Sequence, residues 1–408
     1  MLPAVDALLA RHESTKLRDY VDQLGLRKRP AFQCHQDFIE EVANYTGESL
    51  GSELGAAVAE ELREMPQVLS ANHHGIDFFA QSTQSNLLFS LRNRGDGTAR
   101  KTIPVLACGT VPLNNLTYPR GLLIYACTDA VGDSGICKLP IFPDSYKRKL
   151  VSVAGPFTAE MLHRARGRAK KLIEDEKLIR PLESALNTVF DDFDFVGQGF
   201  PDYARQATVV NHRLWRSLFR GRSCRSELVC IDLERIASRL LERDLFDNSS
   251  ICPQLMFDPG LRARLIENLD GQRGCWQVEK LLQRCSGLAS AGGFGQPGSA
   301  LGTGTMFFWG VDAKGRQVPL HVDETREGTA PELRGVDDSG LTWAIPFTPE
   351  GISRGLRDNR LLPSIFTSYL LVSIARGIDC IGGYYQADYL PNMREAVIET
   401  LSSDSGTA

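Results

Sequence analysis

Apolar residues recur at helical intervals through the first part of the chain. Val5 and Leu8 form one such set, and Val58 and Leu62 belong to a later one. Residues three and four apart lie on the same face of an α-helix. The spacing therefore predicts a helical N-terminal region over residues 1–65.

The pattern changes in region 66–145, where short and nearly continuous apolar runs alternate with a helical stretch. A helix is predicted over residues 77–91, because the apolar residues there return to helical spacing. Apolar strands on both sides of a helix are typical of a parallel or mixed sheet that is covered on both faces. Region 66–145 is therefore predicted to be an α/β core. Its predicted strands cover residues 66–72, 102–109, 121–127 and 137–142.

The remainder of the chain is predicted to be mainly helical, with one hairpin. Region 146–290 contains a helical pattern at residues 158–173 and a strand that runs into a helix at residues 226–241. Region 291–408 begins with a glycine-rich stretch, continues with two apolar runs joined by a turn, and ends in helices. A β-hairpin over residues 306–323 accounts for the two apolar runs.

Together these patterns predict an α/β protein. We expect a mixed or mostly parallel sheet flanked by helices, with a helical N-terminal region and a C-terminal hairpin-plus-helix region. No internal repeat or long linker separates the four regions. One continuous α/β body is therefore expected rather than a string of independent domains.

The composition is that of a folded protein without a strong electrostatic preference. The 408 residues are 42% hydrophobic and 24% charged, and the formal net charge is −4. These values exclude a disordered chain, and the balanced charge argues against nucleic acid or an anionic membrane surface as the partner. The sequence shows neither a signal peptide nor an apolar run of membrane-spanning length, which predicts a cytoplasmic protein.

The ten cysteines include no C-x-x-C pair. The spacing therefore argues against a zinc knuckle and against a thioredoxin-type redox pair. Free thiols in a reducing cytoplasm are the expected state of most of these cysteines. The sequence identifies no cofactor.

The first candidate site lies where the first predicted strand ends. Asn72, His73, His74 and Asp77 follow that strand closely, and ligands of open α/β sheets gather outside the carboxyl ends of the strands. We expect His73 or His74 to act as a general base or acid, with Asp77 orienting it and Asn72 contacting the substrate. The alternative is that Asn72 or Asp77 caps a helix and one histidine packs against the sheet.

The second candidate site follows the next predicted strand and should lie beside the first. Cys108 stands at the strand end and would be a nucleophile if a histidine lowered its pKa. Asn114 and Asn115 offer amide groups for binding a polar substrate, and Arg120 offers a planar guanidinium. The alternative is a turn-rich connection with a buried thiol.

A third candidate site is a metal site formed with the C-terminal region. His321 and Asp323 alternate along a predicted strand, so their side chains share one face. Together with His73 or His74 they would make a set of two histidines and a carboxylate, which binds several divalent metals. The alternative is an ordinary edge strand.

Two glycine-containing segments of the same region are expected to complete the substrate site. Tyr385 and Gln386 follow two glycines, which suits a loop that contacts a ligand. The glycine-rich stretch at residues 292–305 is expected to close over the site as a lid.

Three arginines share one predicted helix face. Arg213, Arg216 and Arg220 stand three and four residues apart. Such a face can hold a phosphate or another anion. The alternative is a solvated face, or pairing with acidic residues.

Three functional hypotheses follow from these features. The leading one is a cytosolic enzyme that acts on a small polar metabolite, a hydrolase or group transferase with histidine general acid/base catalysis. The first alternative is a metal-dependent enzyme that uses His73 and His74 with His321 and Asp323. The second is a non-catalytic ligand- or partner-binding protein that uses the arginine face. A homo-oligomer is compatible with all three.

Overall fold

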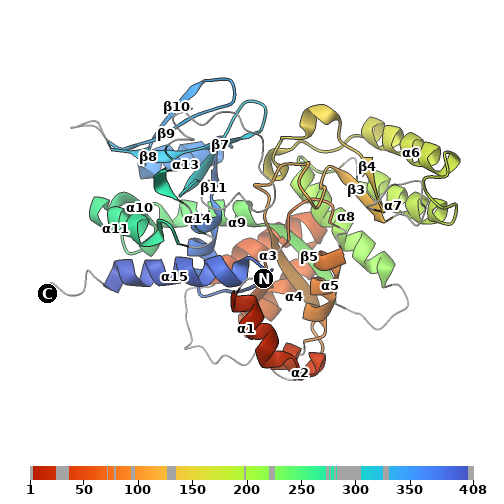
Figure 1. Ribbon diagram of the computed structural model, residues 1–408, viewed down its shortest axis with the longest axis horizontal. Coiled ribbons are helices and arrows are strands. Elements are labelled where there is room, and N and C mark those ends of the chain that lie inside the picture. Colours follow the sequence, from red (N-terminus) through yellow and green to blue (C-terminus); the bar gives the residue numbers. More distant parts are fainter. Residues whose placement is uncertain are drawn as a thin grey trace. The chain divides into compact units, whose positions relative to one another are not determined.

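The computed structural model of the chain shows two compact units (Figure 1). The first, called the sheet unit, consists of Leu17–Arg27 and Val42–Leu233. The second, called the C-terminal unit, consists of Met1–Lys16, Lys28–Glu41 and Glu234–Ala408. The structure describes residues 3–23, 36–70, 72–77, 80–92, 97–125, 135–196, 199–219, 226–272, 275, 277–279, 282, 305–324 and 330–402.

Three parallel strands form the centre of the sheet unit, namely β1 (Gln67–Leu69), β2 (Thr102–Ala107) and β5 (Glu227–Asp232). Strand β2 pairs with β1 on one side and with β5 on the other. Every residue of β2 is buried, as the uninterrupted apolar run of a strand covered on both faces requires. The predicted α/β fold with a mostly parallel sheet flanked by helices is confirmed.

The register of β2 and β5 aligns the ends of the two strands. The end at which they start is called the amino edge of the sheet, and the end at which they finish is called the carboxyl edge. Thr102 lies opposite Glu227, and Ala107 lies opposite Asp232, so the two strands begin and end together. Polar residues that follow Ala107 therefore stand at the carboxyl edge, whereas Glu227 stands at the amino edge.

Helices of the sheet unit pack against these strands. Helices α4 (Ser52–Glu64) and α5 (Ala80–Ser90) contact β2, and α8 (Tyr203–Leu218) contacts β5. Helix α5 also connects β1 to β2 and so completes a β-α-β crossover. Earlier in the chain stand α2 (Leu17–Gln23) and α3 (Gln36–Leu50).

The predicted strands at residues 121–127 and 137–142 form, but not in the central sheet. They appear as β3 (Gly121–Tyr125) and β4 (Ile136–Pro140), which pair antiparallel in a two-stranded sheet of their own. The connection between them is too short for the crossover that two parallel neighbours need, so the chain turns back on itself.

A second core lies under this small sheet. It is covered by α6 (Ala159–Glu174) and α7 (Leu182–Val196). Helix α6 begins where the Thr158 side chain accepts a hydrogen bond from the Met161 amide, which confirms the helix predicted there. The aromatic side chains of this core are Phe142, Phe157, Phe190, Phe193 and Tyr203.

The C-terminal unit combines helices with two small antiparallel sheets. Its sheets have the strand orders β10-β9-β8 and β11-β6-β7. Its helices are α1 (Pro3–His12), α9 (Leu233–Asp244), α10 (Ile251–Phe257), α11 (Pro259–Leu269), α13 (Pro349–Arg357), α14 (Ile365–Tyr369) and α15 (Gln386–Ser402), and its strands are β6 (Phe308–Val311), β7 (Gln317–Pro319), β8 (His321–Asp323), β9 (Glu332–Val336), β10 (Thr342–Pro346), β11 (Leu361–Pro363) and β12 (Asp379–Ile381).

The predicted hairpin is present but shorter than expected. Strands β6 and β7 pair antiparallel, yet β7 ends at Pro319 and β8 pairs with β9 in the other sheet. The Thr305 hydroxyl bonds both backbone groups of Leu320, at 2.6 Å to the carbonyl and 3.3 Å to the amide nitrogen. Leu320 therefore makes no strand pairing, and the placement of His321 and Asp323 on the second hairpin strand was wrong.

A strand that runs into a helix was also predicted and is present as β5 followed by α9. The helix predicted near the C-terminus begins as α14 and continues as a π-helical turn at Leu370–Ile374. Within the described parts of the chain, none of the helices has both the length and the apolar character that a bilayer crossing requires.

The glycine-rich stretch expected to act as a lid lies outside the described residues, apart from Thr305. The boundaries of the four sequence regions stay a prediction.

Candidate functional site

The candidate site lies at the carboxyl edge of the parallel sheet. The pairing of β1 and β2 continues past the strands, because His73 and Cys108 form a parallel bridge. The Cys108 amide donates to the Asn72 carbonyl at 2.9 Å, and the His74 amide donates to the Cys108 carbonyl at 2.7 Å. Residues directly opposite each other in a ladder project to the same face. The side chains of His73 and Cys108 therefore leave the sheet on the same face.

The imidazole of His73 is held by a short chain of side chains. The Asn115 side-chain oxygen accepts hydrogen bonds from the Thr117 amide and from the Thr117 hydroxyl, both at 2.8 Å. Because that hydroxyl proton is used, the Thr117 oxygen accepts from the imidazole, and its distance to His73 Nδ1 is 3.4 Å. The arrangement places the ring proton on Nδ1 and leaves Nε2 as the proton acceptor.

The electrostatic setting favours a neutral imidazole at His73. Burial lowers the pKa of His73 below its ordinary value of 6.5, and the side-chain hydrogen bond with Asn115 opposes that shift only in part. A neutral imidazole at neutral pH is the form that takes up a proton. The site is therefore suited to a general base.

A glycine and a tyrosine shape the turn after the histidines. Gly75 has a φ of +119°, and a Cβ there would lie 2.3 Å from the Cβ of Pro119, so only glycine fits. The buried Tyr203 hydroxyl accepts a hydrogen bond from the Ile76 amide at 3.0 Å and donates one to the Pro119 carbonyl. Burial raises the pKa of Tyr203 far above its ordinary value, which keeps this hydroxyl protonated.

Helix α8 holds the other side of the same turn. The Asn211 side-chain oxygen accepts from the Asp77 amide at 3.1 Å, and its amide group donates to the Gly75 carbonyl at 2.8 Å. Both backbone groups of the turn are thus satisfied by one side chain. The position of His73 is set by the sheet on one side and by α8 on the other.

The described cysteines of the sheet unit differ in exposure. Cys108 is partly exposed, and its sulfur lies 3.3 Å from the Thr110 hydroxyl oxygen. Cys137 and Cys230 are buried, and burial raises the pKa of both thiols, that of Cys230 to about 12. Cys108 therefore has the access to solvent that a nucleophile needs.

The other residues predicted at the first strand end take different places. His74 has an exposed fraction of 1%, so its imidazole is packed inside the protein. Asn72 is also buried, and its side-chain amide donates to the Asp77 carboxylate at 3.4 Å. The described contacts thus join Asp77 to Asn72 and α8, while His73 is held by Thr117.

Asn114 and Arg120 belong to the same connection, and both bond to the segment after β4. Asn114 is exposed, and its backbone amide donates to the Lys147 carbonyl at 3.1 Å. Arg120 is buried and donates from Nε to the Phe142 carbonyl at 2.9 Å, while its terminal nitrogen pairs with Asp144. The Arg120 guanidinium thus bonds to the segment after β4.

Tyr385, Gln386, His321 and Asp323 belong to the C-terminal unit. Tyr385 is exposed, and Gln386 is buried with its amide donating to the Tyr369 hydroxyl. Asp323 pairs with Arg334 at 3.2 Å on the neighbouring strand β9. Across the described residues, no three His, Cys, Asp or Glu side chains are grouped to hold a metal ion.

A second feature of the sheet unit is a cavity of about 630 Å³ between α7, α8 and the start of β5. Arg213 and Arg216 of the predicted arginine face line it, whereas Arg220 lies outside the described residues. His212 and Trp215 were expected beside these arginines, whereas Ser49, Asp192, Glu227 and, at the carboxyl edge, Thr117 were not predicted from the sequence. A hydroxyl two residues after Asn115 was the available signal for Thr117, because such a residue can bond back to an asparagine side chain.

No protein-family model matches the chain, and neither the curated proteins nor the solved structures include a match to it. The structure brings His73 and Cys108 together at the carboxyl edge of the sheet in an α/β protein.

Proposed function

We propose that the protein is a hydrolase or group transferase that acts on a small polar metabolite. The observation that carries the proposal is the pairing of His73 with Cys108 at the carboxyl edge of the sheet. In this scheme His73 is the general base and acid, and Cys108 is the nucleophile.

The proposed reaction transfers an acyl-type group in two steps. His73 Nε2 takes the proton of the Cys108 thiol, and the resulting thiolate attacks the carbonyl carbon of the substrate. The protonated imidazole then gives that proton to the leaving group as its bond to the carbon breaks, which leaves a thioester on Cys108. Water or an acceptor alcohol or amine, deprotonated by His73, attacks the thioester and releases the product and the thiol.

The amide nitrogen of Asn115 supports this scheme. It is buried and has no hydrogen-bond partner among the described residues, while the oxygen of the same side chain bonds Thr117. An unsatisfied buried donor costs about 1–3 kcal/mol. We assign it to the substrate oxygen, on which negative charge develops during the attack.

The proposed setting is the cytoplasm. All six cysteines that the structure describes are free thiols, and a reducing compartment keeps a nucleophilic thiol in that state.

Alkylation of Cys108 tests the pair without knowledge of the substrate. Wild-type protein and His73→Gln are treated with iodoacetamide from about pH 5.5 to 8.5, and modification of each cysteine is followed by peptide mass spectrometry. At neutral pH we expect Cys108 to react about tenfold faster in the wild type, because only there is its proton removed by a neighbouring base. Cys380, which is also partly exposed, serves as the internal reference within each sample.

Equal alkylation rates and equal pH dependence of Cys108 in the two proteins would contradict the proposal. The chemical step has its own test, in which p-nitrophenyl acetate should give a burst of p-nitrophenolate. The burst should disappear in Cys108→Ser and persist in Cys137→Ser, a matched change at a buried thiol. A burst of unchanged size in Cys108→Ser would place the acyl-accepting nucleophile elsewhere.

A further inference from the structure

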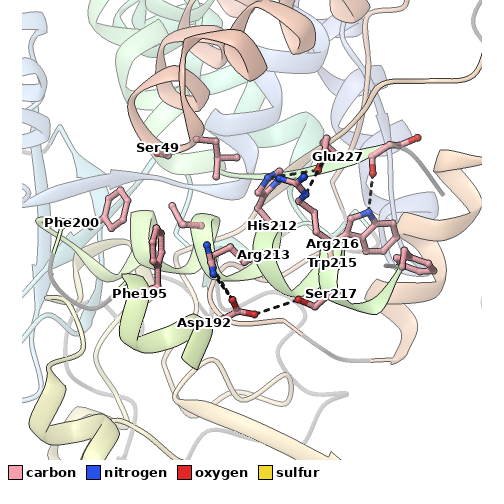
Figure 2. A pocket seen from close by; sticks show the side chains of 14 residues that line it. Ser49, Asp192, Phe195, Phe200, His212, Arg213, Trp215, Arg216, Ser217 and Glu227 are labelled. Carbon is pink, nitrogen blue, oxygen red and sulfur yellow. Dashed lines mark hydrogen bonds and ion pairs between the residues drawn. The ribbon is translucent and has the colours of Figure 1, made fainter. Parts of the chain in front are cut away.

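The cavity between α7, α8 and β5 lies at the amino edge of the sheet, away from His73 and Cys108. Figure 2 shows the side chains that line it. Its volume of about 630 Å³ is within the range of small-molecule sites. Three features of its lining, taken in turn, define the chemistry of a ligand.

The first feature is an exposed aromatic ring together with a packed aromatic pair. Phe195 has an exposed fraction of 72%, and the Arg213 guanidinium carbon lies 4.1 Å from its ring centroid. Trp215 and Phe219 pack with their centroids 4.5 Å apart, and the indole nitrogen donates to the Ser226 carbonyl at 2.9 Å. Because Trp215 is buried, Phe195 is the aromatic surface on which a planar ring of a ligand can stack.

The second feature is a pair of hydrogen-bond acceptors that face each other. His212 Nδ1 lies 3.0 Å from the Leu228 carbonyl oxygen, and since a carbonyl only accepts, the ring proton stands on Nδ1. Burial lowers the pKa of His212, so Nε2 carries a lone pair near neutral pH. That nitrogen lies 3.7 Å from Glu227 Oε2, a buried oxygen without a hydrogen-bond partner among the described residues.

Two acceptor atoms 3.7 Å apart, with no donor between them among the described residues, call for a donor from outside the chain. An amino group supplies two N–H donors at once and would satisfy both Nε2 of His212 and Oε2 of Glu227. Ser49 adds a third polar group. Its exposed fraction is 9%, it lines the cavity, and its hydroxyl has no partner within the described part of the chain.

The third feature is the distribution of charge. Arg213 is held by Asp192, with distances of 2.8 Å from Nε and 2.7 Å from the terminal nitrogen. Arg216 has only one ion pair among the described residues, at 3.7 Å to Glu227, and its side chain is 66% exposed. Most of the Arg216 guanidinium therefore remains available to an anionic group of a ligand.

We propose that this cavity binds a nucleoside monophosphate whose base carries an amino group. The base would stack on the exposed Phe195 ring, its amino group would donate to His212 and Glu227, and its phosphate would pair with Arg216. This site is separate from the proposed catalytic pair and does not depend on it.

Calorimetric titration of the full chain tests the proposal with four probes. Adenosine 5′-monophosphate should bind with a Kd below about 1 mM. Uridine 5′-monophosphate has one ring N–H donor on its base in place of an amino group. It should bind about tenfold more weakly because one of the two acceptors stays unpaired. Adenosine and ribose 5-phosphate, each missing one half of the ligand, should both bind more weakly than adenosine 5′-monophosphate.

Three variants assign the interactions to residues. Arg216→Gln should weaken binding of adenosine 5′-monophosphate by about tenfold and leave adenosine unaffected. Glu227→Gln should abolish the preference for the adenine over the uracil nucleotide, and Phe195→Ala should weaken both. The matched controls are Arg164→Gln and Phe246→Ala, which change an exposed arginine and an exposed phenylalanine that do not line the cavity.

Two results would overturn the proposal. One is the absence of measurable binding of adenosine 5′-monophosphate to the wild-type protein. The other is binding that Arg216→Gln, Glu227→Gln and Phe195→Ala change no more than the two controls do. Because Cys108→Ser and His73→Gln should bind the nucleotide normally, failure of this proposal and failure of the proposed enzyme function are separate outcomes.

Discussion

The two edges of the parallel sheet carry different chemistry around a histidine. At the carboxyl edge, His73 stands beside a thiol and is oriented by Thr117 and Asn115. At the amino edge, roughly 20 Å away along a strand, His212 stands beside the Glu227 carboxylate and is oriented by a backbone carbonyl. Both rings place their proton on Nδ1 and direct Nε2 away from the anchoring group.

The residue paired with each histidine decides what the ring can do. A thiol gives up its proton to a neutral imidazole and becomes a nucleophile. A carboxylate has no proton to give, so the two acceptors wait for a donor from a ligand. If both proposals hold, one sheet unit carries a reactive edge and a binding edge.

The largest expected effect is a loss of stability from a substitution at the carboxyl edge alone. Gly75→Ala should lower the free energy of unfolding by about 3 kcal/mol, because it adds a clash with Pro119 to the strain of a positive φ. Gly97→Ala is the matched control, since Gly97 also has a positive φ but open space around its Cβ position. Urea denaturation measures both, and equal losses would show that the Pro119 contact is not what constrains the turn.

A smaller loss is expected from removing one hydroxyl. Tyr203→Phe leaves the buried Ile76 amide without its acceptor and should cost about 2 kcal/mol. It should also speed hydrogen exchange at Ile76. Tyr45→Phe removes another buried hydroxyl, bonded to Thr208 at 3.1 Å, and should leave exchange at Ile76 unchanged. Equal exchange at Ile76 in the wild type and in Tyr203→Phe would show that this hydroxyl does not hold the turn.

Substituting each histidine in turn and measuring both properties sharpens the comparison further. His73→Gln should slow alkylation of Cys108 by about tenfold and leave nucleotide binding intact. His212→Gln should weaken nucleotide binding, since it removes one of the two acceptors. It should leave the alkylation rate of Cys108 unchanged. Iodoacetamide labelling and calorimetry on both variants give the four values. Loss of both properties in either variant would mean that the two edges are not independent.

The sequence predicted the carboxyl edge better than the amino edge for a physical reason. The residues after two consecutive parallel strands meet at one edge, so the neighbourhood of His73 and Cys108 follows from the order of the strands. Thr117 escaped the prediction because its position depends on the turn that Asn115 forms with it, a contact that no spacing rule shows.

The amino-edge cavity could not be assembled from sequence. Its polar groups come from α3, α7, α8 and β5, and Ser49 is far from Glu227 along the chain. The helical spacing of Arg213 and Arg216 was readable, but their partners Asp192 and Glu227 belong to other elements. The break at Leu320 has the same origin, because it depends on the Thr305 hydroxyl.

The smallest expected effect is a dependence of stability on pH that both edges share. Burial lowers the pKa of His73 and of His212 below 6.5, and it does the same for His321 in the C-terminal unit. Below pH 6.5 the unfolded chain takes up protons that the native state does not, so the free energy of unfolding is at its full value above that pH. It falls as the pH drops toward the native pKa of each ring, by at most about 1.4 kcal/mol per pH unit for each histidine. Around His212 the opposing groups are Glu227, which favours the charged ring, and Arg213 and Arg216, which disfavour it.

Urea denaturation between about pH 5.5 and 7.5, above the range in which ordinary carboxyl groups titrate, should show this loss in the wild type. His73→Gln and His212→Gln should each remove a part of it, and His321→Gln should remove a part that belongs to neither edge. If all three variants lost as much stability over this range as the wild type, the native rings would titrate at their ordinary pKa and would not be the neutral acceptors on which both edges depend.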